Sequence, residues 1–365
     1  MEAVTRVFAT LNTTGQRLTP FEIVVALLWG ADEIDLRSDV EEYFAISDYL
    51  AQMDSTGEIV LQTIALLAGE SLKKSLLPRV ITADRYHAHI GTAVEALENL
   101  GEFLTERLGV GLDATSELIP YDSIFPPMSV LLMRIQSQLS GSEQVEARRK
   151  LEKWFVCAPL DNRYQEGVHN KQQNDVREVW DWVLKGEDYT PEWIDTLRVP
   201  SIRSVSVSGA IGRLLKCIVN AQAPRDPIED NPVGWRPGIT STEVHHLFPK
   251  RFCSQHLAGW DNDRDNSNVA LNTVPVTRAT NRQWAKDDPQ NQVNQIKQSL
   301  KKPTVWEERL KKLFISPDAL AIMGKPDKTR EDFLAFIEAR EQDFFRFLTD
   351  NYDLEAGGTG EVLED

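Results

Sequence analysis

The sequence predicts a mainly α fold, in which a multi-helical domain precedes a small strand–strand–helix segment flanked by further helices. Apolar residues recur at i, i+3 and i+4 along most of the chain, and strict alternation is rare. A hydrophobic content of 41% and a charged content of 26% are typical of a folded globular protein. The strand pattern is clearest over Thr242–Phe248 and over "VALNTVPV", Val269–Val276, after which "TRATNRQWA" can start a helix.

The expected domains follow from this pattern and from the breaks in it. A chain of 365 residues is long enough for two or three domains. We expect a helical domain over residues 1–195, a second domain over 196–352 with its core motif at 241–288, and an acidic, flexible tail over 353–365. The stretch "APRDPIEDNPVGWRPGIT" contains four prolines and two glycines, which indicates a loop or a domain joint before the motif.

The first helix has the clearest start signal. In "LNTTGQRLTPFEIVVALLW", Thr19 is placed to cap the helix, Pro20 takes the first helical position and Glu22 the third. Further helices are expected at about 37–53, 56–77, 81–107, 126–140, 144–157, 172–185, 204–222, 281–286, 290–300, 303–313 and 329–352.

The composition excludes several classes of protein. The three cysteines, Cys157, Cys217 and Cys253, are too few and too widely spaced for a disulfide framework or a four-cysteine zinc site, so we expect them to be reduced and buried. No apolar run is long enough to cross a bilayer and no secretory signal opens the sequence, so the expected location is cytoplasmic, with no membrane partner.

Charge is distributed unevenly along the chain. A net charge of −16 argues against a protein that coats nucleic acid over its whole surface. From His245 to Lys312, however, 12 Lys and Arg face 7 Asp and Glu, a balance of +5, whereas from Leu313 to Asp365 the counts are 5 and 13, a balance of −8. The basic segment coincides with the strand–strand–helix region.

Two of the six histidines, His245 and His246, are adjacent in "EVHHLFPKRF" at the end of the first expected strand. The order strand, loop, strand, helix, with an Asn opening the helix, is that of a ββα-metal nuclease site. Phosphodiester hydrolysis needs a base that works near neutral pH and a cation that stabilises charge on the phosphate. Five basic residues on or beside these elements are candidates to hold a nucleic-acid backbone, namely Lys250, Arg251, Arg278, Arg282 and Lys286.

The same residues carry a resemblance to a known family. "EVHHLFPKRF" followed by "ALNTVPVTRATNRQWAKDDP" resembles the C-terminal HNH nuclease domain of the GmrSD-type modification-dependent restriction endonucleases. The opening "LNTTG" stretch and "WFVCAPLDNRYQEGVHNKQQNDVREVWDWVL" resemble other parts of that family, so the resemblance extends over most of the chain.

The resemblance implies a role for each residue that matches the motif. His246 would be the general base, His245 and Asn281 would hold a divalent ion, Mg²⁺ or else Mn²⁺, and Asn272 would be the central Asn that orients His246. Asn272 is preferred because it precedes Asn281 by nine residues, but Asn268 lies close enough to take the central role instead. The implied activity is nicking or cleavage of DNA as the effector of a restriction or anti-phage system.

The family also implies a further domain and the partners of the nuclease. In the family, a ParB-like nucleotide-using module carries a motif that precedes the "LNTTG" loop, and this sequence begins just before that loop. We therefore expect a C-terminal portion or a natural split protein, with DNA, modified or foreign, as its partner and a separate nucleotide-binding domain or subunit as a further one. Relatives sense glucosylated hydroxymethylcytosine or, in the SspE branch, phosphorothioate.

Other interpretations of these motifs stay open at the sequence level. The segment could be a catalytically weak module that only binds DNA or a partner protein. "DNDRDN", Asp261–Asn266, hints at a calcium loop but lacks the glycine and the glutamate that such a loop needs, which favours a solvated loop. Arg163 and Tyr164 in "NRYQ" are expected to serve packing and helix capping rather than chemistry.

Overall fold

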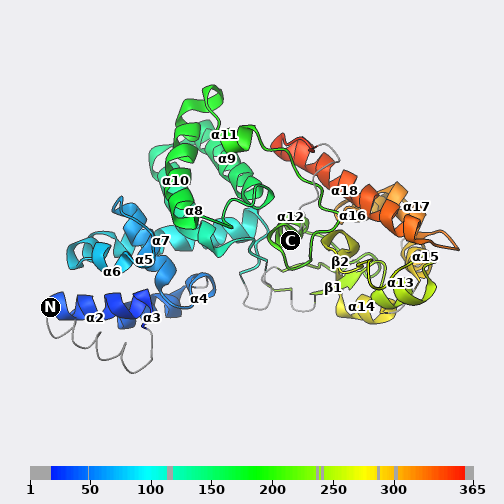
Figure 1. The fold of residues 1–365 in the computed structure, drawn as a ribbon, viewed down its shortest axis with the longest axis horizontal. Helices are drawn as coiled ribbons and strands as arrows, with labels where there is room; N and C mark the ends of the chain where they lie inside the picture. Colours follow the sequence, from blue (N-terminus) through cyan, green and yellow to red (C-terminus); the bar gives the residue numbers. More distant parts are fainter. Residues whose placement is uncertain are drawn as a thin grey trace. The chain divides into compact units, whose positions relative to one another are not determined.

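The computed structural model describes residues 18–47, 49–112, 118–235, 238–239, 242–285, 288–299 and 303–357. The "LNTTG" loop, Lys286 and residues 358–365 therefore lie outside the described residues. The chain divides into two compact units (Figure 1). The first unit comprises Met1–Leu104, Tyr121–Ala158 and Asn162–Asp195, and the second comprises Thr105–Pro120, Pro159–Asp161 and Thr196–Asp365.

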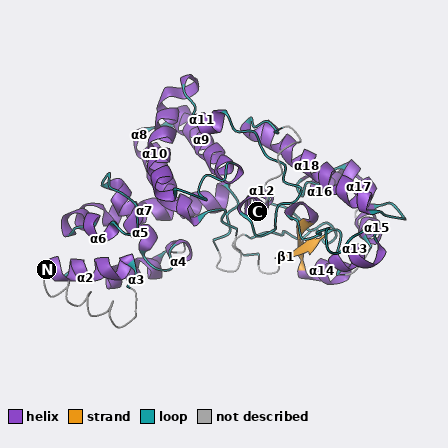
Figure 2. Cartoon of the chain, in the orientation of Figure 1, coloured by secondary structure: helices purple, strands orange, loops and turns teal. Residues whose placement is uncertain are grey.

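The first unit is built from helices, as Figure 2 shows by colour. In chain order they are α2 (Pro20–Asp32), α3 (Leu36–Ile46), α4 (Leu50–Met53), α5 (Glu58–Leu67), α6 (Leu77–Val80), α7 (Ala83–Arg107), η1 (Asp122–Ile124), α8 (Phe125–Gln138), α9 (Gly141–Leu160), α10 (Val168–Lys185), η2 (Gly186–Asp188) and α11 (Glu192–Asp195). Helix α8 packs against both α5 and α10 at the centre of the unit.

Local sequence signals explain the start of α2. Thr19 Oγ1 accepts a hydrogen bond from the Glu22 amide at 3.2 Å, and the Thr19 amide donates to Glu22 Oε2 at 2.7 Å. Pro20 occupies the first turn, where its missing N–H costs no hydrogen bond. The predicted cap is confirmed.

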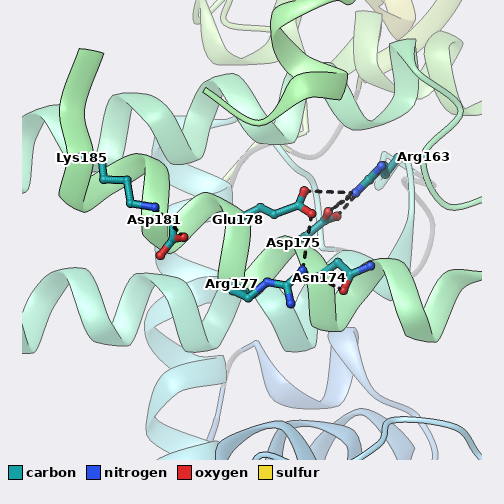
Figure 3. A network of polar contacts seen from close by, with 7 residues as sticks. All are labelled: Arg163, Asn174, Asp175, Arg177, Glu178, Asp181 and Lys185. Atoms are coloured by element: carbon teal, nitrogen blue, oxygen red, sulfur yellow. Dashed lines mark hydrogen bonds and ion pairs between the residues drawn. The ribbon is translucent and has the colours of Figure 1, made fainter. Parts of the chain in front are cut away.

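A buried ion pair holds the chain after α9 against α10 (Figure 3). Asp175 is fully buried and accepts hydrogen bonds from Arg163 Nη2 at 2.5 Å and from the Tyr164 hydroxyl at 2.6 Å. Arg163 also stacks on the Trp193 ring, with its guanidinium carbon 4.3 Å from the ring centroid. Arg163 and Tyr164 thus have the packing role that the sequence predicts.

The second unit contains the two strands found among the described residues. Its elements are α12 (Ala210–Ala221), β1 (Thr242–His246), α13 (Lys250–His256), η3 (Ala270–Asn272), β2 (Thr273–Thr277), α14 (Arg278–Trp284), α15 (Pro289–Ser299), α16 (Pro303–Lys311), α17 (Pro317–Met323) and α18 (Arg330–Tyr352). Strands β1 and β2 pair antiparallel, with Thr242 opposite Thr277 and His246 opposite Thr273. Helix α14 begins at the residue after β2 and packs on β1.

Aromatic packing fixes the chain directly after β1. Phe248 is fully buried, and its ring centroid lies 4.8 Å from that of Phe336 and 5.5 Å from that of Phe333, both on α18. On the β2 side, the buried Arg340 of α18 donates to the carbonyl oxygens of Leu271 and Thr273. Helix α18 therefore holds the segments that precede β2 and follow β1.

The mainly α fold class is confirmed, with a few differences from the predicted elements. The short helices α6, α11, α13 and α17 are missed, because helices of four to seven residues give few turns in which a periodic pattern can show. The helix predicted over 56–77 ends at Leu67, and the one predicted over 204–222 begins only at Ala210.

The expected flexible tail needs a correction over its first residues. Leu354 is buried, the Val199 amide donates to Glu355 O at 2.9 Å, and the Gly357 amide donates to Val199 O at 2.8 Å. Residues 353–357 are therefore packed within the second unit, beside Val199.

The three cysteines are free and buried, as predicted. Within the described ranges, no helix has both the length and the apolar content required to cross a membrane.

Candidate functional site

His245 and Asn281 meet between β1 and α14. His245 is buried, and its Nδ1 lies 2.8 Å from Asn281 Oδ1. The imidazole ring of His245 also packs on the indole of the buried Trp284, with ring centroids 5.3 Å apart. Asn281 and Trp284 both lie on α14, so this one helix positions the hydrogen-bond partner of His245 and the ring that packs on it.

Glu243 completes this cluster. Side chains alternate along a strand, so Glu243 and His245 share one face of β1. Glu243 Oε2 accepts from Asn281 Nδ2 at 2.5 Å, and Glu243 Oε1 accepts from Arg278 Nε at 2.9 Å. These hydrogen bonds, that of Asn281 first, lower the pKa of the Glu243 carboxyl.

The Glu243 contact decides which way the Asn281 amide points. A carboxylate only accepts hydrogen bonds, so the NH₂ group of Asn281 must face Glu243. The amide oxygen of Asn281 is thereby turned toward His245 Nδ1. Glu243 is a site residue that the sequence prediction missed, although its position two residues before His245 on a strand is the signal that would have found it.

His246 is bonded to Asn268, not to Asn272. His246 Nε2 lies 3.0 Å from Asn268 Oδ1, and because an amide oxygen only accepts, Nε2 is the donor of this hydrogen bond. Asn268 is exposed, and its loop is held by Arg330, whose Nε lies 2.7 Å and 2.8 Å from the two carboxylate oxygens of Asp265. The loop "DNDRDN" thus supports the orienting residue of His246.

Asn272 has another role than the predicted orientation of His246. It is fully buried, accepts from the Phe248 amide at 2.9 Å, and donates to Phe248 O at 2.9 Å and to Ser267 O at 2.8 Å. It joins the chain that follows His246 to the chain that precedes Asn268. The side chain of Asn272 is already hydrogen-bonded to backbone groups. Asn268, the alternative that the sequence left open, therefore makes the contact with His246.

Four of the five predicted basic residues lie on α13 and α14, the helices that follow β1 and β2 in the chain; Figure 1 shows these two helices. Lys250 and Arg251 open α13 and are exposed. Arg278 and Arg282 are exposed on α14 and line one surface cavity of about 470 Å³, although Arg278 is also paired with Glu243. Lys286 lies outside the described residues.

The His245–Asn281 pair has the spacing of two ligands of one ion. Two ligand atoms at about 2.1 Å from an ion and at right angles to each other are about 3 Å apart, close to the observed 2.8 Å between Nδ1 and Oδ1. Over the described residues, no group of three or more His, Cys, Asp or Glu side chains has a metal-binding arrangement. The pair would therefore supply two ligands of mixed type, an imidazole nitrogen and an amide oxygen.

Comparison with known proteins leaves the family open. No family model matches the chain. It is 23% identical over 376 residues to the uncharacterized protein MJ0686 of Methanocaldococcus jannaschii, an alignment that covers 93% of this chain and 60% of that protein. The chain thus spans about three-fifths of the length of that relative.

Proposed function

We propose that the second unit is an HNH-type nuclease module that nicks or cleaves DNA by metal-dependent phosphodiester hydrolysis. The observation that carries the proposal is the pairing of His245 Nδ1 with Asn281 Oδ1 at 2.8 Å, from the first strand and the following helix, next to a second histidine held by an Asn. A restriction or anti-phage setting is part of the proposal and rests on the sequence resemblance alone.

In this proposal His246 activates the attacking water. The hydrogen bond to Asn268 Oδ1 keeps the proton on Nε2, so Nδ1 is the atom that takes the water proton. Imidazole suits this role because its ordinary pKa lies near neutrality. His246 is the residue adjacent to His245, so the backbone brings the base and the ion ligand to one end of β1.

His245 and Asn281 would hold the divalent ion. When bound, the ion would stabilise charge on the scissile phosphate and on the leaving oxygen. Glu243 keeps the Asn281 oxygen directed toward His245 Nδ1, and Trp284 limits rotation of the His245 ring. Mg²⁺ prefers oxygen ligands, whereas imidazole favours transition metals, so we expect Mn²⁺ to support the activity better than Mg²⁺.

DNA would be held by the basic side chains of α13 and α14. Lys250, Arg251 and Arg282 are exposed and lie in a segment of the acidic chain, His245 to Lys312, that has a positive balance. Because phosphate contacts release counterions, this binding should weaken steeply with salt.

The test is a nicking assay on supercoiled plasmid with Mn²⁺ or Mg²⁺, comparing the wild type with His246→Ala. Loss of a general base costs about 10²–10⁴-fold in rate. His256→Ala is the matched control, because His256 is also an exposed histidine of this unit but lies at the end of α13. We expect His256→Ala to cut like the wild type.

Equal rates for the wild type and His246→Ala would exclude the proposed chemistry. If neither protein cuts, but both shift DNA in the presence of a chelator, the alternative of a catalytically weak DNA-binding module is correct instead.

A further inference from the structure

The proline-rich stretch before β1 contains a buried carboxylate that holds the start of α14. Asp226 is fully buried. Its Oδ2 accepts from the Thr277 amide at 2.8 Å, and its Oδ1 accepts from the Thr280 hydroxyl at 2.8 Å. Asp226 lies 51 residues before Thr277 in the chain, so this contact joins the predicted loop to the helix of the site.

The stretch is itself folded around Asp226. Its Oδ1 also accepts from the amides of Ile228 and Glu229, at 2.8 Å and 2.9 Å, and its own amide donates to Asn231 O at 2.8 Å. The buried Arg309 of α16 donates to the Asp226 carbonyl oxygen at 3.2 Å. Contacts from its own loop therefore hold the Asp226 carboxylate, and a contact from α16 holds its backbone, in addition to the contacts from the start of α14.

The two contacts on α14 bracket its first turn. Thr277 is the N-cap of α14, its hydroxyl accepts from the Thr280 amide at 3.1 Å, and Asn281 directly follows Thr280. A helix of seven residues has little stability of its own, so contacts from outside decide where it begins and how it is rotated. The rotation of α14 in turn decides whether Asn281 faces His245.

We propose that Asp226 is the positioning residue for Asn281, and that it sets the affinity of the site for its divalent ion. This inference rests on the proposed function. Groups that orient metal ligands from behind commonly change metal affinity by about 10–100-fold when they are mutated. Asp226 acts in this way through the backbone and hydroxyl of the α14 first turn, without touching the ion.

The main variant is Asp226→Asn. An Asn side chain accepts through one oxygen only. That oxygen is needed at the Oδ1 position, where the amides of Ile228 and Glu229 donate, so the NH₂ group faces the Thr277 amide, which is another donor. We expect α14 to shift and Mn²⁺ affinity, measured by titration followed with electron paramagnetic resonance, to fall by about 10–100-fold. Thr280→Val removes only the hydroxyl contact, keeps the shape of the side chain and should give a smaller loss, so it also covers the case in which Asp226→Asn folds poorly.

The control is Glu341→Gln. Glu341 is likewise a buried carboxylate that clamps a loop, because it accepts from the Ser201 hydroxyl, the Ile202 amide and Arg203 Nε. The Glu341→Gln substitution should lower the melting temperature without changing Mn²⁺ affinity. Equal losses of affinity in Glu341→Gln and Asp226→Asn would reduce Asp226 to a general stabiliser and overturn the proposal, as would an Asp226→Asn protein with unchanged affinity.

A metal-free readout separates this proposal from the nuclease proposal. In the wild type without metal, His245 Nδ1–H donates to Asn281 Oδ1, which gives a slowly exchanging ring proton in nuclear magnetic resonance spectra. We expect this signal to be lost in Asp226→Asn and kept in Glu341→Gln. If the wild type binds no Mn²⁺, or if His245→Ala binds it equally well, the proposed function fails. The ring proton then tests the positioning role by itself. Its loss in Asp226→Asn supports that role, and its retention overturns it.

Discussion

The buried Asp175 cluster of the first unit and the His245–Asn281 cluster of the second unit each combine polar side chains that the sequence singles out with a carboxylate that it does not. In the first cluster the carboxylate is fully buried and its oxygens accept from Arg163 and Tyr164 (Figure 3). In the second cluster His246, Glu243 and Asn281 are held by neighbours but keep part of their surface exposed.

The titration of the two clusters follows from this difference. Burial raises the pKa of Tyr164, and the charge of Asp175 raises it further. The pKa of Arg163 is also raised, because its hydrogen bond and ion pair with Asp175 outweigh its burial. The raised pKa values keep Arg163 charged and Tyr164 neutral at ordinary pH, and their contacts with Asp175 stabilise the fold. A cluster that is oriented but open to solvent can exchange protons and ligands.

The largest expected effect comes from a substitution that breaks the buried Asp175 cluster. Asp175→Ala leaves the guanidinium of Arg163, only 12% exposed, with Glu178 at 3.9 Å as its remaining carboxylate, and it should lower the free energy of unfolding by about 3–5 kcal/mol. Urea unfolding followed by circular dichroism measures it. Asp181→Ala, which breaks the exposed pair with Lys185 on the same helix, should cost no more than about 0.5 kcal/mol. Similar losses of unfolding free energy in the two variants would show that burial does not make the Asp175 cluster important for stability.

A second prediction separates the two asparagines of the site. Asn268→Ala should slow nicking by about 10–100-fold, since His246 loses the group that fixes its tautomer, and should leave stability within about 0.5 kcal/mol. Asn272→Ala should instead lower the free energy of unfolding by about 2–3 kcal/mol, because backbone groups of Phe248 and Ser267 lose their buried partner. A stable but inactive Asn272→Ala protein, with a fully active Asn268→Ala protein, would reverse these roles.

The smallest expected effect concerns the loop that carries Asn268. Burial opposes the charge of Asp265, but hydrogen bonds from the Asp261 amide and from Arg330 hold its pKa below the ordinary value. A lowered pKa means that the charged form contributes stability above the ordinary carboxyl pKa of about 4, and that this contribution is lost as pH falls through the lowered value. Asp265→Asn should therefore be less stable than the wild type by about 1–2 kcal/mol at pH 7.

The two proteins should converge in stability as the pH falls below about 4. Chemical unfolding at a series of pH values measures this convergence. A difference that stays constant from pH 7 to pH 3 would show that the ion pair with Arg330 does not hold the loop.

Sequence reasoning succeeds where the deciding contacts are local. The capping box at Thr19 and the order of β1, β2 and α14 follow from residues a few positions apart. It fails where the deciding contact is distant. The side chain of Asn272 is hydrogen-bonded to backbone groups of Phe248, 24 residues away, and no spacing rule reveals this contact.

The role of Asp226 has the same cause. In the sequence it belongs to a stretch of prolines and acidic residues that indicates only a loop, because its partner Thr277 lies beyond β2. Short helices such as α13 are lost for a different reason, since one or two turns carry no measurable period.

The central claim is that His245 and Asn281 hold one divalent ion beside His246. A crystal structure of the protein soaked with Mn²⁺, with anomalous scattering recorded, tests it directly. The account predicts an anomalous peak about 2.0–2.2 Å from both His245 Nδ1 and Asn281 Oδ1, with His246 Nδ1 left uncoordinated. A peak bound by His246 instead, or a saturating Mn²⁺ soak that leaves the 2.8 Å hydrogen bond between His245 and Asn281 intact, would contradict it.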